Sequence, residues 1–275
     1  MTVASINAGG DFRVGDVLSR AWSIFTGNLV FFLAVPFLIN LVSTVLGAAI
    51  GIFIAMGALT TSPALLIVGG IIGGLFALGL NVIGQGVLLI GAFQRLREEP
   101  LRVGVAVQHA MARAMPLIGV TVLATLAIIG LMLVSGAVVW VVALALGRLA
   151  ILSAVLWLGV IAVLFTLAIM WCVAVPACLV ERLGPVQSLA RSADLTKGYR
   201  WKITGIMLLL LLMVAVAVLL IFAATTLGTL TTAIVRFVWT VAWTGFFNCA
   251  IIMVYHDLRV AKEGVDTSQL ASVFD

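Results

Sequence analysis

Long apolar runs separated by short polar segments dominate this chain. One of them, ITGIMLLLLLMVAVAVLLIFAA, begins at Ile203 and contains no charged residue. A membrane β-barrel strand alternates apolar and polar positions over about ten residues, whereas a helix needs an apolar run of about 20 residues to cross the hydrocarbon core. The continuous pattern therefore predicts membrane-spanning helices.

Four apolar blocks divide into six predicted spans. The polar sequence LTTSPA separates the first two blocks. The third block is too long for one helix and carries a single charge at Arg148, where we expect a turn with Gly147. The fourth block divides at the sequence GTLTT, which begins at Gly228. The blocks cover residues 29–56, 65–93, 116–180 and 203–255.

Lysine and arginine are distributed unevenly across these spans. Thirteen of the fifteen lie in segments that share one side, and the opposite side holds only Arg148 and Arg236. All ten acidic residues also lie on the basic side. Because basic loops remain in the cytoplasm, the pattern predicts that both termini are cytoplasmic.

The segments that precede each pair of spans resemble one another. FRVGDVLSRAWSIFTGNLV begins at Phe12, LRVGVAVQHAMARAMPLIG begins at Leu101, and LGPVQSLARSADLTKGYRWKITG, from Leu183, is a looser third copy. The chain is therefore expected to form three repeated units, each an amphipathic elbow helix followed by a helical hairpin. These units cover residues 12–93, 101–180 and 183–256, and residues 257–275 form a cytoplasmic tail.

The elbow segments have helical periodicity, which is typical of helices that lie in the headgroup plane of a membrane. Gly198 is expected to end the third elbow helix. The alternative is that these segments are ordinary loops of a helix bundle. The expected apolar faces are Val14, Val17, Leu18, Ala21, Trp22 and Phe25 in the first elbow, Val103, Val107, Ala110, Met111 and Ala114 in the second, and Val186, Leu189, Ala190 and Ala193 in the third.

The composition agrees with a chain that is almost entirely membrane domain. Apolar residues make up 64% of it and charged residues 9%, and the mean hydropathy is +1.32. Soluble domains are about half apolar and a quarter charged. The net charge of +5 is explained by the topology signal and by anionic lipid, so we expect no nucleic-acid partner. The predicted fold is a single all-α integral membrane domain over residues 1–275 with six transmembrane helices.

Two stretches, VPACLVERLGPVQSLARSADLTKGYRWKI at 175–203 and YHDLRVAKEGVDTSQLASVFD at 255–275, resemble a bacterial inner-membrane family. That family is similar to the membrane domain of glycerophosphoryl diester phosphodiesterases. The resemblance implies six helices in the bacterial cytoplasmic membrane. It does not imply catalysis, because the enzymes carry a separate barrel domain with a His-Arg pair and a Glu-x-Asp pair. In this chain Ala110 follows His109, Asp257 follows His256, and no Glu-x-Asp occurs.

Reactive chemistry is hard to find in the sequence. His109 and His256 lie far apart, and Cys172, Cys178 and Cys249 lie within apolar runs. There is no HExxH pair, no GxSxG elbow and no phosphate-binding glycine loop. We therefore expect no catalytic residue, no metal site and no cofactor.

Intramembrane polar residues are the candidates for a transport pathway. The predicted spans contain no Asp, Glu or Lys, which argues against a proton- or sodium-coupled carrier. Asn81 and Gln85 lie one helical turn apart on one face, and Asn248 lies in the sixth span. Hydrogen bonding between helices is the simpler role for all three.

Glycine motifs in the first hairpin predict close helix packing. GAAIG places Gly47 and Gly51 four residues apart, and GGIIGG spans residues 69–74. Small residues at this spacing allow two helices to approach closely, either within the hairpin or between two copies of the chain. The glycines of the second motif are Gly69, Gly70, Gly73 and Gly74.

Basic residues at the membrane surface are candidates for contact with lipid headgroups, since arginine binds phosphate well. The candidates are Arg148 and Arg236 on the outer side, and Arg182, Arg191, Lys197, Arg200 and Lys202 on the cytoplasmic side.

The sequence favours a non-enzymatic membrane protein that organises the membrane or its lipids, or that serves as a membrane partner of other proteins. Membrane lipids are its expected partners, with a homo-oligomer or other membrane proteins as alternatives. A channel or transporter for a small apolar or lipid-like solute is the second hypothesis. An intramembrane enzyme is the third.

Overall fold

The computed structural model describes residues 13–59, 63–97, 99–145 and 150–264, and every regular element among them is an α-helix. Six of these helices are long and apolar enough to cross a membrane, so the predicted number of spans is confirmed. The helices are α1 (Val14–Gly27), α2 (Leu29–Leu59), α3 (Pro63–Leu96), α4 (Val103–Ala112), α5 (Ala114–Ala145), α6 (Ala150–Trp171), α7 (Ala174–Val180), α8 (Pro185–Thr196), α9 (Arg200–Thr225) and α10 (Thr229–Glu263).

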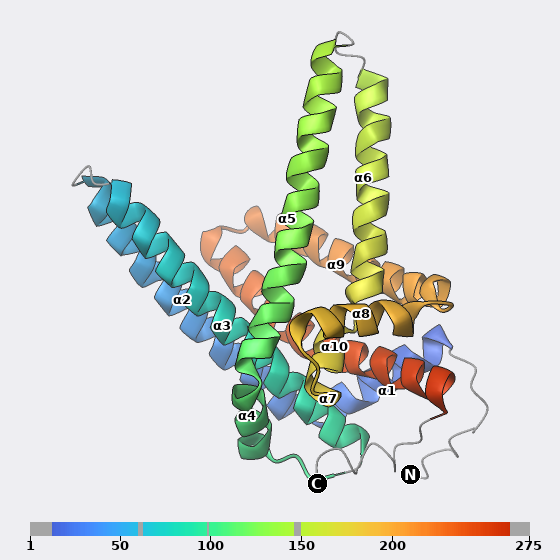
Figure 1. The fold of residues 1–275 in the computed structure, drawn as a ribbon. Helices are drawn as coiled ribbons and strands as arrows, with labels where there is room; N and C mark the ends of the chain where they lie inside the picture. The colour runs from blue at the N-terminus through green and yellow to red at the C-terminus, as the bar shows by residue number, and fades with distance from the viewer. Residues whose placement is uncertain (1–12, 60–62, 98, 146–149, 265–275) are drawn as a thin grey trace.

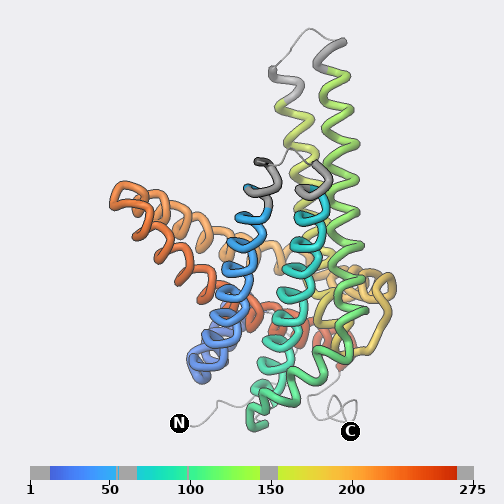
Figure 2. Tube along the Cα trace, turned by 90° about the vertical axis from the view of Figure 1, so that its left-hand side faces the viewer, coloured from blue at the N-terminus to red at the C-terminus, as the bar shows by residue number. Residues whose placement is uncertain are grey.

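Three helical hairpins diverge from a common base (Figure 1). The hairpins are α2 with α3, α5 with α6, and α9 with α10. Their tips point away from one another, whereas α1, α4, α7 and α8 lie together at the opposite ends of the spans (Figures 1 and 2). The elements expected on the cytoplasmic side are therefore gathered at one end of the molecule, which we call the base.

Prolines mark several of the helix boundaries. Pro63 begins α3, Pro185 begins α8, and Pro116 lies in the first turn of α5. A proline has no backbone N–H and fits the first turn of a helix, but it interrupts a helix interior. Pro176 accordingly explains a break that we had not predicted: the fourth span reaches Val180 as expected, but α6 ends at Trp171 and a separate short helix, α7, completes it.

Two glycines make the expected turns. Gly198 follows α8 with φ of +92°, which confirms that it ends the third elbow helix. Gly228 precedes α10 with φ of +112°, at the predicted turn between the fifth and sixth spans. A residue with a Cβ rarely adopts either conformation.

The core lies in the base and is organised around the C-terminal half of α10. Almost every residue from Gly245 to Leu258 is buried, on all sides of the helix. This part of the molecule packs against α1, α2, α3, α7 and α8. The largest fully buried side chains include Tyr255, Phe32, Leu88, Leu117, Leu195 and Ile252.

The hairpins, in contrast, expose most of their apolar surface. In the most apolar windows of the first five spans, only 11–17% of the residues are buried, compared with 56% for α10. Large side chains such as Val134, Trp140 and Leu219 are more than half exposed. Exposed apolar surface on this scale requires a lipid environment.

All three elbow segments form separate helices, α1, α4 and α8, each of which precedes a hairpin. Contrary to our expectation, the apolar face of the first elbow does not lie wholly on the membrane. Val17, Ala21 and Phe25 of α1 are buried in the protein core, and α1 packs against α10. Trp22, from the same expected face, remains 55% exposed. Part of this face therefore serves protein packing rather than the membrane.

The third elbow presents three different faces. Its buried face carries Ser188, Ser192 and Leu195. Its expected apolar face is divided, because Val186 is 69% exposed whereas Leu189 packs against the protein core. The polar residues Gln187, Arg191 and Asp194 occupy a third direction, opposite the apolar one. A helix that packs on protein with one face and presents an apolar face outward is suited to the membrane surface.

The α2–α3 hairpin uses only some of the predicted glycines for its internal packing. A Cβ at Gly73 would lie 2.2 Å from Cδ1 of Ile50, and one at Gly69 would lie 3.2 Å from Phe53. Gly84 meets Ile39 in the same way. The remaining glycines of the two motifs, Gly47, Gly51, Gly70 and Gly74, have no such neighbour within 4 Å.

Candidate functional site

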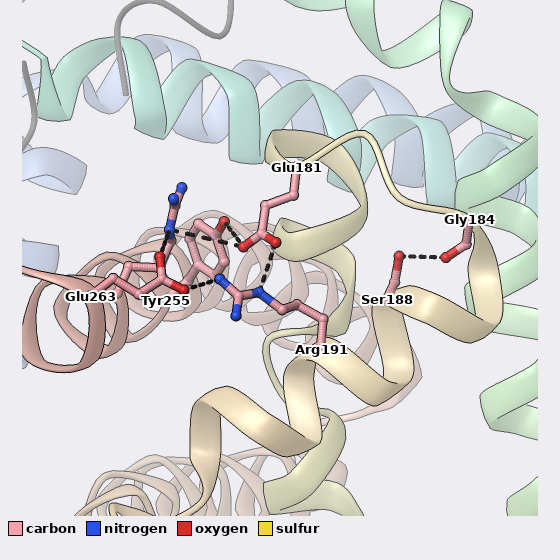
Figure 3. A network of polar contacts seen from close by, with 7 residues as sticks. Glu181, Gly184, Ser188, Arg191, Tyr255 and Glu263 are labelled. Carbon is pink, nitrogen blue, oxygen red and sulfur yellow. Dashed lines mark hydrogen bonds and ion pairs between the residues drawn. The ribbon is translucent and has the colours of Figure 1, made fainter. Parts of the chain in front are cut away.

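A network of charged side chains joins three helices of the base (Figure 3). Glu181, which directly follows α7, accepts a hydrogen bond from the Tyr255 hydroxyl at 2.9 Å and one from Nε of Arg191 at 2.7 Å. The Arg191 guanidinium also pairs with Glu263. Arg259 pairs with Glu263 at 3.0 Å. The network therefore fixes α7 and α8 to the last turns of α10.

Arg191 is the centre of this network. Partial burial acts to lower the pKa of Arg191, but its hydrogen bonds to Glu181 and Glu263 and the charges of these carboxylates raise that pKa above its ordinary value. The guanidinium therefore stays charged. Its fork of donors suits two carboxylates at once.

Two further contacts attach neighbouring helices to α10. Arg20 of α1 pairs with Asp257 at 2.5 Å, and Asp257 also lies 3.2 Å from Nδ1 of His256. Nζ of Lys262 donates to the backbone oxygen of Asp194 in α8. The Arg20–Asp257 and Lys262–Asp194 contacts each join α10 to an elbow helix.

Two buried serine hydroxyls of α8 bond main-chain oxygens, and one of them joins α8 to the end of α6. Ser192 donates to the backbone oxygen of Met170 at 2.7 Å, and Ser188 donates to that of Gly184 at 2.8 Å. Met170 lies in the last turn of α6, where carbonyl groups lack helical partners. Ser192 therefore satisfies a main-chain group that the break between α6 and α7 leaves available, whereas Ser188 bonds the N-cap residue of its own helix.

A cavity of about 430 Å³ lies in the base between α3, α4, α7 and α10. Its volume falls within the range of sites for small ligands. One part of the wall is apolar, with Leu89, Phe93 and Ile252 among its residues. The other part is polar and includes Gln94 and His109.

Positive charge dominates the polar part of the wall. Arg97 and Arg102 line the cavity together with one carboxylate among the described lining residues, Glu99. The Arg97 side chain is only 10% exposed, lies 4.8 Å above the Phe93 ring, and pairs with Glu99 at 3.5 Å. Glu99 is 49% exposed, so water weakens its neutralising effect.

A second hollow of about 180 Å³ adjoins this cavity and shares Ile90, His109 and Leu179 with it. It adds two more arginines, Arg113 and Arg182. Arg182 is the only non-glycine residue with a positive φ, of 54°, in the described part of the chain. Strained backbone of this kind is most frequent at functional sites.

The predicted headgroup candidates lie at different places. Lys197, Arg200 and Lys202 are exposed together at the junction of α8 and α9, and Lys202 lies 5.8 Å from the Tyr199 ring. Arg191 is engaged in the charged network, and Arg182 lines the smaller hollow. On the opposite side, Arg236 is exposed in α10, and Arg148 lies outside the described residues.

The predicted polar candidates within the spans do not share a site. Asn81 and Gln85 are exposed on the same face of α3, and the Asn81 amide donates to the Ala77 carbonyl of its own helix at 2.8 Å. Asn248 is buried in α10 and donates to Thr244. These bonds to the carbonyl four residues earlier in the same helix account for the Asn81 and Asn248 amides without a ligand.

Compared with models of protein families, with curated proteins and with solved structures, this chain has no match. Within the described residues, no group of three or more His, Cys, Asp or Glu side chains is arranged to hold a metal ion. The three cysteines are free thiols in the helical part of the chain. The cavity is therefore the feature that has most in common with a binding site.

Sequence reasoning did not find this cavity. Its charged residues come from the segment that joins α3 to α4 and from the elbow α4, and its apolar residues come from four helices. A sequence signal was present, because Arg97, Arg102 and His109 fall within one short basic stretch. Their convergence on a single hollow depends on the packing of α7 and α10.

Proposed function

We propose that this chain is a non-enzymatic protein of the bacterial cytoplasmic membrane that organises membrane lipids from the inner leaflet. The base lies at the cytoplasmic surface, with both termini in the cytoplasm. The three pairs of elbow and hairpin are repeated units, as the similarity of their sequences indicates. The base also serves as a surface for other membrane proteins or for a second copy of the chain.

The observation that carries this proposal is the divergence of the three hairpins from one compact base (Figure 2). Five of the six spans bury few of their residues against protein, so lipid chains must fill the space between them. The elbow α8 adds an outward apolar face at the level of the headgroups. A compact bundle, in contrast, would cover most of the same apolar surface with protein.

The test is the amount of lipid that the protein immobilises. The full chain is reconstituted into bilayers that contain spin-labelled phospholipid, and the fraction with restricted motion is measured per protein molecule. A compact six-helix membrane protein of similar mass is the control. We expect clearly more restricted lipid around this chain than around the control, and an equal amount would contradict the proposal.

Transport of a lipid-like solute is the second candidate, and the partly apolar cavity is the observation that favours it. The same vesicles distinguish the two functions. Lipid organisation predicts that a fluorescent phospholipid in the inner leaflet stays protected from a membrane-impermeant reductant. Rapid loss of that protection on reconstitution would favour transport.

A further inference from the structure

We propose that the cavity between α3, α4, α7 and α10 binds the phosphate headgroup of an anionic glycerophospholipid. This inference deepens the proposed function and rests on it, because it requires that the base lie at the inner leaflet. The chemical feature that the cavity would recognise is a phosphate anion attached to an apolar chain.

Charge is the first argument. Arg97 and Arg102 line the larger cavity, and Arg113 and Arg182 line the hollow beside it. Glu99 is the only carboxylate among the described residues of the two linings. Arginine guanidinium groups bind phosphate oxygens through paired, charge-assisted hydrogen bonds. An excess of arginines around one hollow therefore selects an anion with several oxygen acceptors.

The position of Arg97 is the second argument. Its side chain is 10% exposed and stacks on the Phe93 ring, so the guanidinium is held in place within the wall rather than extended into water. The backbone N–H of Arg102 donates to the Gln94 side chain at 3.2 Å, which fixes the chain where it returns towards α4. The Arg97 guanidinium and the backbone at Arg102 are thereby positioned before any ligand arrives, which lowers the entropic cost of binding.

The apolar part of the lining is the third argument. Leu89, Leu179 and Ile252 line the same cavity as the polar residues, and Ile90 lines both this cavity and the adjoining hollow. A free phosphate ion would leave this apolar surface unused. A headgroup followed by the first part of an acyl chain matches both kinds of wall. At about 430 Å³ the cavity has room for the headgroup region, while the rest of each chain remains in the bilayer.

The experiment measures which lipid the full chain retains. The protein is incorporated into nanodiscs that contain equal amounts of phosphatidylglycerol and phosphatidylcholine, extracted into mild detergent, and analysed by native mass spectrometry. We expect phosphatidylglycerol to be retained about tenfold more than phosphatidylcholine, since the extra charge-assisted contacts favour the anionic lipid. Equal retention of the two lipids would overturn the proposal.

The variant that tests the site combines Arg97→Gln with Arg102→Gln. The ratio of retained phosphatidylglycerol to retained phosphatidylcholine should fall about tenfold in this variant. The matched control combines Arg200→Gln with Lys202→Gln, which removes the same charge from the exposed junction of α8 and α9, and it should keep the preference. If both pairs reduce the preference equally, the arginines act as a general charged surface and the cavity assignment is wrong.

A second variant tests the cavity in case the double arginine variant does not fold. Ile90→Trp keeps every charge and fills the space that the two hollows share. We expect this variant to keep its helical circular dichroism and its elution as a single species, and to lose retained phosphatidylglycerol. Undiminished retention in a folded Ile90→Trp protein would overturn the proposal.

Competition distinguishes a lipid from a small anion. Glycerol 3-phosphate carries the same phosphate without acyl chains, and we expect it to displace phosphatidylglycerol only at much higher concentration. Displacement at equal concentration would overturn the assignment to a lipid. The amount of motionally restricted lipid should be the same for the wild type and all cavity variants. If the wild type restricts the expected amount of lipid but shows no preference for phosphatidylglycerol, only this inference is wrong. If the wild type restricts no more lipid than the control protein, the proposed function is wrong.

Discussion

Gly245 of α10 packs directly against the backbone of Phe32 in α2. A Cβ at position 245 would lie 2.2 Å from the Phe32 carbonyl oxygen and 2.9 Å from Cε2 of Phe25. Pro36, four residues after Phe32, has no N–H with which to bond that carbonyl inside the helix. The absence of a side chain at position 245 thus allows the last span to approach the first hairpin at a place where helical hydrogen bonding is interrupted.

Gly245→Ala is therefore expected to destabilise the base. The obstacle is a backbone atom, which cannot rotate away as a side chain does, so the cost should be at least about 1–3 kcal/mol, as for other overpacked cores. A fall in the thermal unfolding temperature in detergent measures it. Gly130→Ala, at a position with nothing within 4 Å, is the control and should leave that temperature almost unchanged. Identical melting of Gly245→Ala and wild type would show that the contact is not tight.

Arg191→Gln should loosen the third elbow helix from the rest of the base. The substitution removes one of the two cations that Glu181 and Glu263 share, so these partly buried carboxylates keep only Arg259, which lies 3.9 Å from Glu181 and 3.0 Å from Glu263. We expect a loss of about 1–2 kcal/mol, discounted from the value for a fully buried pair because the side chains retain some exposure. Limited proteolysis in the segment between α8 and α9 should accelerate. Lys197→Gln, on an exposed residue of the same segment, should behave like the wild type.

Tyr255→Phe removes a single hydrogen bond from the same network and keeps the buried ring. The hydroxyl donates to Glu181 at 2.9 Å, so its loss should cost about 1 kcal/mol. Combining this change with Arg191→Gln should cost less than the sum of the two, because both act on Glu181. Strict additivity in the thermal unfolding of the double variant would argue that the network is not coupled.

Arg20 and Asp257 should respond unequally to substitution. The Asp257 side chain is 9% exposed and that of Arg20 is 46% exposed. Arg20→Ala leaves a buried carboxylate without its guanidinium and should cost about 1–2 kcal/mol, whereas Asp257→Asn leaves a cation that water can solvate and should cost less. The combined variant should recover part of the loss in unfolding temperature. A greater loss from Asp257→Asn than from Arg20→Ala would reverse this assignment.

The proposed orientation of the chain predicts which positions are accessible from outside the cell. Thr226→Cys lies at the hairpin end between α9 and α10, and Lys197→Cys lies at the base. A membrane-impermeant maleimide should label only the first in intact cells and both after permeabilisation. The unsubstituted chain is the background control, since Cys178 and Cys249 are buried. Labelling of Lys197→Cys in intact cells would invert the proposed topology.

The number of spans and the turn at Gly228 were predictable because they depend on local sequence. The length of an apolar run determines whether it crosses a bilayer, and Gly198 and Gly228 end or begin helices through their own backbone freedom. The break at Trp171 was missed although Pro176 signals it. The continuous apolar run around this proline concealed the end of the helix.

The faces of the elbow helices and the cavity were not predictable in the same way. An apolar stripe on a helix shows that it avoids water, but protein and lipid both satisfy this requirement. Phe25 therefore faces α10, whereas Val186 remains accessible. The buried surface of α8 carries Ser188 and Ser192, which periodicity alone assigns to no apolar face. The cavity depends on the meeting of four helices, which no single stretch of sequence records.

The central position of α10 has a consequence for biogenesis. Its C-terminal half supplies the surface on which α1, α2, α3, α7 and α8 meet, yet it is the last described helix to leave the ribosome. The first two hairpins, which meet through α3 and α5, must therefore wait in the bilayer without the surface on which much of the base packs. The base is then completed in one late step, when α10 docks, rather than helix by helix during synthesis. A nascent chain arrested before Thr229 would hold two inserted hairpins that still lack the helix against which α1, α2 and α3 pack.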